Sequence, residues 1–153
     1  MYSSEKRGVE KTLTDPAIEV TIVTKTIARG MLEKYKNKHF AKWARNESIS
    51  DKDLSRILEE MSRGLLGDRL GAHLYKKRMG LAGRGKRGGA RTIVLFKQDE
   101  IALFLYGYSK NEKDTLTTGE EEQLRIVAKE FMRLSAAQRE KLKEEGKLIE
   151  IKE

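Results

Sequence analysis

The spacing of apolar and polar residues predicts a helix between Ser50 and Gly64. Apolar residues recur there at intervals of three and four, the spacing of a single helical face: Leu54, Ile57, Leu58 and Met61. Ser50 and Asp53 have the spacing of a capping box, and Gly64 stands where a glycine ends a helix. Before it, Tyr35–Phe40 is typical of a short strand that enters a helix with an apolar face made by Phe40, Trp43 and Ala44. We expect an antiparallel helical hairpin whose stripe, with Trp43, packs in the core.

Three strands are predicted after this hairpin. One lies around His73–Met79, the second at Arg91–Lys97 and the third at Ile101–Tyr108, the most apolar stretch of the chain. Gln98–Glu100 is a tight polar turn between the last two. We therefore predict a β-hairpin with a third antiparallel strand before it.

Two further helices are predicted near the C-terminus. Thr118 with Glu121, and Ser135 with Gln138, have the spacing of capping boxes. The first helix has an apolar face made by Leu124, Val127, Ala128, Phe131 and Leu134. The second ends near Gly146, and a short apolar tail follows at Leu148–Ile151.

This order of elements predicts an α+β domain over residues 31–153, with helices packed on one face of a small antiparallel sheet. Residues 1–30 form an N-terminal extension with a different pattern. Its segment Ala17–Ala28 is rich in β-branched residues and is typical of a strand. The extension is either dispensable, translated from an upstream start codon, or an extra strand that pairs with a sheet edge.

Composition excludes several classes of function. The chain has 153 residues, no cysteine and two histidines, so disulfide frameworks, thiolate metal sites, cysteine nucleophiles and multi-histidine metal centres are not expected. No apolar run has the roughly 18 residues that span a membrane, and Met1–Gly8 lacks a signal-peptide core. We expect a cytoplasmic protein that needs no cofactor and no membrane.

The charge of the chain is concentrated in its centre. The net charge is +8, and the segment Arg69–Lys113 carries this whole excess, because eleven of its residues are basic and three are acidic. A concentrated basic surface favours a polyanion, with nucleic acid as the first candidate, over a charged surface kept for solubility.

Within this segment, residues 83–88 match the letters G-x-G-x-x-G. The glycines precede a strand instead of opening a helix, so a dinucleotide site is rejected. We predict that Gly80–Gly89 is a flexible loop whose amides and cations contact phosphate. The alternative is an exposed glycine-rich turn with incidental charge.

The short turn at Gln98–Glu100 should bring Arg91 and Lys110 together at the open end of the hairpin, and the basic residues at 76–78 can converge there. Clustered cations make a lysine easier to deprotonate, and an arginine suits a phosphorane transition state. Such a cluster can cleave RNA through the 2′-hydroxyl, or it can only bind phosphate. Tyr106 and Tyr108, which should project from the face opposite Leu105, either stack on bases or belong to the core. The two histidines, His39 and His73, are expected to be structural or solvent-facing.

Three segments resemble the RelE/HigB-type toxins of bacterial type II toxin–antitoxin systems: residues 74–78 (LYKKR), 85–92 (GKRGGART) and 104–113 (FLYGYSKNEK). The resemblance covers residues 34–151. It implies a RelE-like fold with a curved sheet, and an endoribonuclease that cleaves mRNA in the ribosomal A site and leaves a 2′,3′-cyclic phosphate. It also implies an antitoxin that covers the basic surface, and contact with operator DNA only through the toxin–antitoxin complex.

By motif position, Arg91 matches the arginine that contacts the reacting phosphate, and Lys110 or Lys86 is the candidate for proton transfer. The other candidate RNA-binding residues are Lys76, Lys77, Arg78, Arg84, Arg87, Tyr108, Asn111 and Lys113. The sequence departs from the wider family at Thr115 and Leu116, where many members have a catalytic tyrosine or histidine. A non-catalytic toxin that inhibits DNA gyrase, as the ParE branch does, therefore stays an alternative, as does a basic nucleic-acid-binding module.

Overall fold

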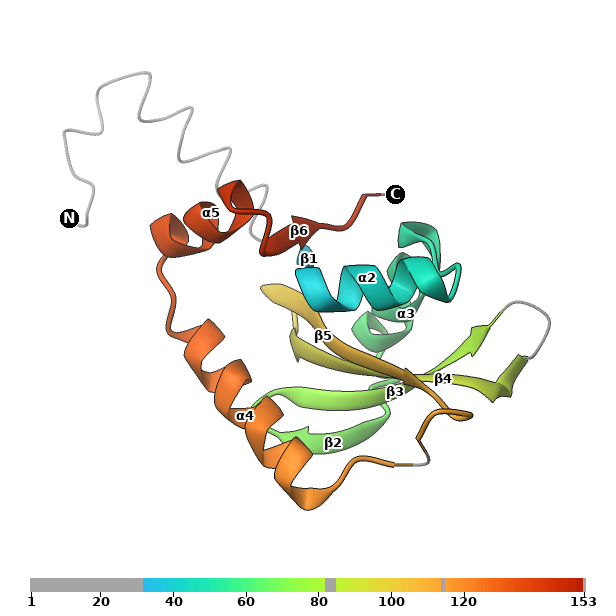
Figure 1. Cartoon of the computed structure of the whole chain (residues 1–153). Helices are drawn as coiled ribbons and strands as arrows, with labels where there is room; N and C mark the ends of the chain where they lie inside the picture. Colours follow the sequence, from blue (N-terminus) through green and yellow to red (C-terminus); the bar gives the residue numbers. More distant parts are fainter. Residues whose placement is uncertain (1–31, 82–84, 114, 153) are drawn as a thin grey trace, which may run out of the picture. The chain divides into compact units, whose positions relative to one another are not determined.

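The structure, a computed structural model, describes residues 32–81, 85–113 and 115–152 (Figure 1). The predicted extension over residues 1–30, with its strand, lies outside these residues. The elements, in chain order, are β1 (Glu33–Asn37), α2 (Lys38–Asn46), α3 (Asp51–Ser62), β2 (Asp68–Gly71), β3 (Leu74–Leu81), β4 (Gly85–Lys97), β5 (Ile101–Ser109), α4 (Thr118–Met132), α5 (Ala136–Glu144) and β6 (Leu148–Glu150).

These elements form an α+β fold around a six-stranded sheet with the order β2-β3-β4-β5-β1-β6. The predicted antiparallel set β3-β4-β5 is its centre, and the turn at Gln98–Glu100 closes with Asp99 at a φ of 61°. β1 instead runs parallel to β5, and β6 pairs antiparallel with β1. A parallel pair needs a long connection, which here contains the helical hairpin and three strands.

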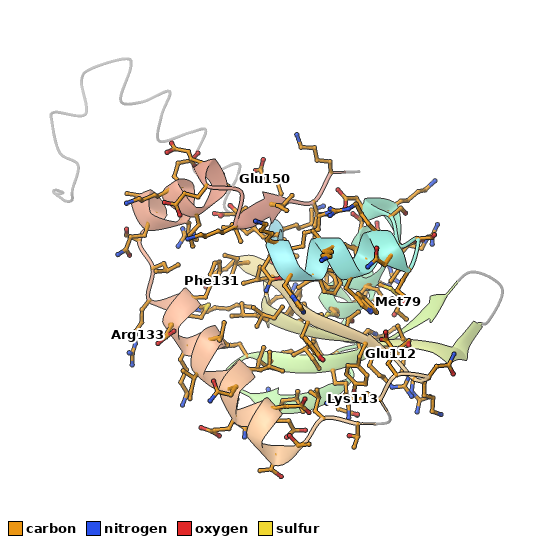
Figure 2. The ribbon with its side chains drawn as sticks, in the orientation of Figure 1. Met79, Glu112, Lys113, Phe131, Arg133 and Glu150 are labelled. Atoms are coloured by element: carbon orange, nitrogen blue, oxygen red, sulfur yellow. The ribbon has the colours of Figure 1, made fainter. Side chains whose placement is uncertain are left out.

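Helices pack on both faces of this sheet, whereas the sequence analysis predicted helices on one face only. The hairpin α2–α3 packs on one face, where the rings of Phe40 and Phe104 lie 5.1 Å apart and Leu54 and Met61 are fully buried. On the other face, Phe131 of α4 joins a core cluster with Leu103 of β5 (Figure 2). The reason is that the central strands are apolar on both faces, so each face must be buried.

The helix ends agree with the predicted capping boxes in α3 and α5, but not in α4. There the N-cap is Thr117, with Glu120 as its partner, in place of Thr118 and Glu121. Thr117 with Glu120 and Thr118 with Glu121 have the same spacing in sequence, so spacing alone does not distinguish the two capping boxes. In the observed one, the carboxylate of the capping residue Glu120 also forms an ion pair with Lys113. Val127, predicted on the inner face of α4, is 43% exposed.

Candidate nucleic-acid interface

A row of three side chains crosses strands β3, β4 and β5 near the C-terminal end of β5. Arg78 of β3 lies directly opposite Arg91 of β4, which in turn lies opposite Tyr108 of β5. Opposite residues on neighbouring strands have Cβ atoms about 4.5–5.5 Å apart on the same face of the sheet. Arg78 is exposed and Arg91 is half-buried. We call these residues the arginine row.

The charges of the arginine row favour an anion. Like charges directly opposite each other on a sheet are destabilising, and an anion held between two guanidinium groups removes that repulsion. Arginine suits phosphate in particular, because its planar fork donates two parallel hydrogen bonds. Lys76, two residues before Arg78, stands on the same face and lies 4.0 Å from Asp68 of β2.

A β-bulge sets the direction of the two tyrosines. The pairing of β4 with β5 shifts by one residue, so that Ile93 is opposite Tyr106 while Val94 is opposite Phe104. Leu105 is the extra residue, and a bulge of this kind changes which side chains share a face. Tyr106 and Tyr108 therefore belong to the same cluster as Leu105, which corrects the prediction that they face away from it. Their rings lie 5.9 Å apart.

Tyr108 has a buried, protonated hydroxyl and lies opposite Arg91. The side chain is 2% exposed, and its hydroxyl has no hydrogen-bond partner in the described part of the chain. Burial raises the pKa of Tyr108, while the positive charge of Arg91 acts in the opposite direction. The phenol therefore stays protonated near neutral pH, so it can donate a hydrogen bond and cannot serve as a base.

Lys77 does not join the arginine row. Side chains alternate along a strand, so Lys77 points to the opposite face from Lys76 and Arg78. Its Nζ lies 2.9 Å from Glu60 Oε1 of α3 and donates to the carbonyl of Leu65 at 2.9 Å. With its side chain only 10% exposed, Lys77 holds α3 on the sheet.

The segment after β5 brings more polar groups to this end of the sheet. The amide of Lys110 donates to the carbonyl of Gly89 at 3.3 Å, which puts Lys110 beside the strand that carries Arg91, as the short turn predicted. Lys110 and Asn111 are exposed. Lys113 forms an ion pair with Glu120 of α4. The hydrogen bond from Lys113, with that from the amide of Thr117, lowers the pKa of Glu120.

The glycine-rich tract is less of a loop than predicted. β3 extends to Leu81 and β4 begins at Gly85, so most of Gly80–Gly89 has strand backbone. Leu81 pairs with Gly85, and the hairpin is therefore longer than its apolar pattern indicates. Arg84 lies outside the described residues, as do the side chains of Lys86 and Arg87.

Two cavities adjoin Tyr106. One, of about 540 Å³, lies between Tyr106 and the start of α4 and is lined there by Leu116 and Leu124. The other, of about 430 Å³, is lined by α2 and by residues 106–108 of β5. Sequence reasoning missed the α2 residues of the second cavity, and it placed Trp43 in the core. The available signal was a second stripe at helical spacing: His39, Lys42, Trp43 and Asn46.

The described residues contain no group of three histidine or carboxylate side chains that could hold a metal ion. None of their helices has the length and hydropathy of a membrane span.

The fold and the arginine row define a small α+β domain with basic side chains on one face of its sheet. Residues 33–151 match the family described as the RelE toxin of the RelE/RelB toxin–antitoxin system. The match covers well over half of the chain, which therefore belongs to the RelE toxin family. The protein is thus a toxin of a toxin–antitoxin system, and the family implies a cognate antitoxin as its partner. No curated protein matches the chain.

Proposed function

We propose that this toxin is a metal-independent endoribonuclease that acts in the cytoplasm on mRNA in the ribosome and so inhibits translation. The observation that carries the proposal is the arginine row, which places Arg91 between a second arginine and a buried, protonated phenol. That arrangement suits a phosphate whose negative charge increases as it reacts. Family membership supports the assignment.

In the proposed reaction, the ribose 2′-oxygen attacks the adjacent phosphorus and the bond from phosphorus to the 5′-oxygen breaks. The products are a 2′,3′-cyclic phosphate and a 5′-hydroxyl. Arg91 stabilises the pentacoordinate phosphorane, and Arg78 shares its charge. Lys110 or Lys86 accepts the proton of the 2′-hydroxyl and returns one to the 5′-oxygen.

The remaining cations bind the RNA on either side of this phosphate. Lys76 lies on the face of the arginine row, Asn111 follows Lys110 after β5, and Arg84, Arg87 and Lys113 extend the basic segment. The same positive surface is where we expect the antitoxin to bind, because acidic side chains placed there compensate the exposed positive charge. Operator DNA is contacted only through that complex.

Primer extension on mRNA from cells that briefly express the chain tests this proposal. New cuts within reading frames that depend on translation are expected for the native chain and absent for Arg91→Ala. Arg133→Ala is the matched control, since it removes an exposed arginine at the far end of α4 from Lys113 (Figure 2). Growth arrest without cuts would contradict the nuclease. The alternative, inhibition of DNA gyrase as in the ParE branch, would then be tested by an assay of gyrase supercoiling activity.

A further inference from the structure

The free edge of β5 lies next to the arginine row. β1 pairs with β5 only as far as Phe104, so among the described residues no strand neighbours residues 106–108 on that side. α2 follows β1 directly and passes there instead, leaving the cavity of about 430 Å³ between helix and strand edge. Tyr108 both lines this cavity and stands opposite Arg91. The side chain of Tyr108 therefore separates the cavity from the proposed position of the reacting phosphate.

Flat aromatic groups line the cavity. The rings of His39 and Tyr106 are parallel to within 2°, with centroids 6.1 Å apart, and the indole of Trp43 borders the same space. His39 is exposed, so a face of this pair is accessible. Parallel aromatic rings beside cations are the kind of surface on which unpaired bases stack. Lys42, which also lines the cavity and is exposed, supplies a cation.

The strand edge adds polar groups that can recognise a base. Ser109 directs its amide away from β4, because that amide donates to Glu112 Oε1 at 3.1 Å. Alternation along the strand directs the amide and carbonyl of Gly107 to the same edge. One donor and one acceptor in fixed positions match the hydrogen-bonding edge of a nucleobase, which has both. Asn46, on the last turn of α2, contributes a side-chain amide.

We propose that this cavity binds one unstacked nucleobase of the RNA, in the nucleotide next to the phosphate held by the arginine row. The base stacks on the His39–Tyr106 pair and its edge meets Gly107. This inference rests on the proposed function, because it takes RNA to be the polyanion. It assigns base recognition to α2, an element that contributes no residue to the reaction.

Trp43 allows a direct test, since it is the only tryptophan of the chain and borders the cavity. The full-length protein is titrated with a trinucleotide whose 2′-O-methyl riboses cannot be cleaved, and with the same trinucleotide lacking its central base. We expect the complete trinucleotide to quench Trp43 fluorescence and the abasic one to bind at least fivefold more weakly. Equal binding and equal quenching by both would overturn the proposal.

Variants of His39 separate stacking from charge. Base–aromatic stacking contributes about 1–3 kcal/mol, so His39→Ala should weaken binding of the complete trinucleotide about 5- to 150-fold and leave binding of the abasic one unchanged. His39→Phe should restore most of the affinity. Lys42→Ala, which removes an exposed cation at the cavity, should weaken both trinucleotides alike. A loss that His39→Phe fails to restore would contradict a stacking role.

The outcomes also separate this proposal from the nuclease. Base-dependent quenching together with an absence of mRNA cuts would uphold the cavity and reject the proposed reaction. Arg91-dependent cuts together with base-independent binding would uphold the reaction and reject the cavity.

Discussion

The indole of Trp43 lies directly against the backbone of Gly107. A Cβ built on Gly107 would stand 2.3 Å from Cζ3 and 2.4 Å from Cε3 of the indole ring, too close for any real contact. The absence of a side chain at Gly107 is therefore what allows α2 to approach the edge of β5. This close approach fixes the position of the strand segment between Tyr106 and Tyr108, and with it both the cavity and one end of the arginine row.

Gly107→Ala should destabilise the fold by about 1–3 kcal/mol, the usual cost of inserting a methyl group into a filled space. Urea unfolding measures this change. In a Trp43→Ala background the same substitution should have little effect, because the obstructing ring is gone. Gly119→Ala is the control, since its Cβ would meet only Thr117 Oγ1 at 3.9 Å and should cause no loss. A cost that persists without Trp43 would contradict this explanation.

Lys77→Ala should reduce stability without reducing RNA affinity. It leaves Glu60, whose side chain is 22% exposed, without the ammonium that lies 2.9 Å away. Removing one partner of a largely buried ion pair costs several kcal/mol, and we expect about 2–3 kcal/mol because Glu60 keeps some contact with water. Thermal unfolding measures the loss.

Arg78→Ala should weaken RNA binding without reducing stability, and the loss of affinity should be the same for RNAs of different sequence. The slope of binding against salt concentration should fall by about one for this variant and stay unchanged for Lys77→Ala. Equal salt slopes in the two variants would contradict the prediction that Arg78 contacts phosphate and that Lys77, on the opposite face of the strand, does not.

The difference between these two neighbours shows how far the sequence predicts the site. The run of basic residues at 76–78 indicates polyanion binding, but whether Lys77 or its neighbours face the RNA depends on the register of the sheet. The helical stripes, two capping boxes and the central strands follow from local spacing, and the short turn at Gln98–Glu100 places Lys110 beside the strand of Arg91.

The bulge at Leu105 has no such local signal, because it depends on how β4 and β5 pair. The aromatic cavity is also missed, since it needs α2 and β5 together.

Thr117→Ala should destabilise the protein by about 1 kcal/mol, whereas Thr118→Ala should be nearly neutral. The side chain of Thr117 accepts the amide of Glu120 at 3.1 Å, and Glu120 in return accepts the amide of Thr117 at 2.8 Å. Thr118 has the same spacing to Glu121 in sequence but lies within the first turn of α4. Urea unfolding of both variants decides between the registers, and a larger loss for Thr118→Ala would contradict the observed cap.

The last prediction concerns Asp51, which joins three parts of the fold. Its carboxylate accepts a hydrogen bond from Lys36 of β1 at 2.6 Å and from the amide of Lys152, after β6, at 2.8 Å. Burial alone would raise the pKa of Asp51, but these two hydrogen bonds outweigh it and hold the pKa below the ordinary 3.8. A folded-state pKa below the unfolded value means that the contribution to stability is present at neutral pH. It is lost as the pH falls through the folded-state value.

Asp51→Asn should therefore lower the free energy of unfolding by about 1–2 kcal/mol at pH 7, the range for hydrogen bonds to a charged group that is partly exposed. The difference from the native chain should shrink as the pH falls below about 4 and vanish once Asp51 is protonated in the folded protein. Urea unfolding at a series of pH values gives this difference directly. Glu59→Gln is the control, because it removes a charge from an exposed position of the same helix. A deficit in Asp51→Asn that stays constant down to pH 2 would mean that the side chain acts through its shape and not through its charge.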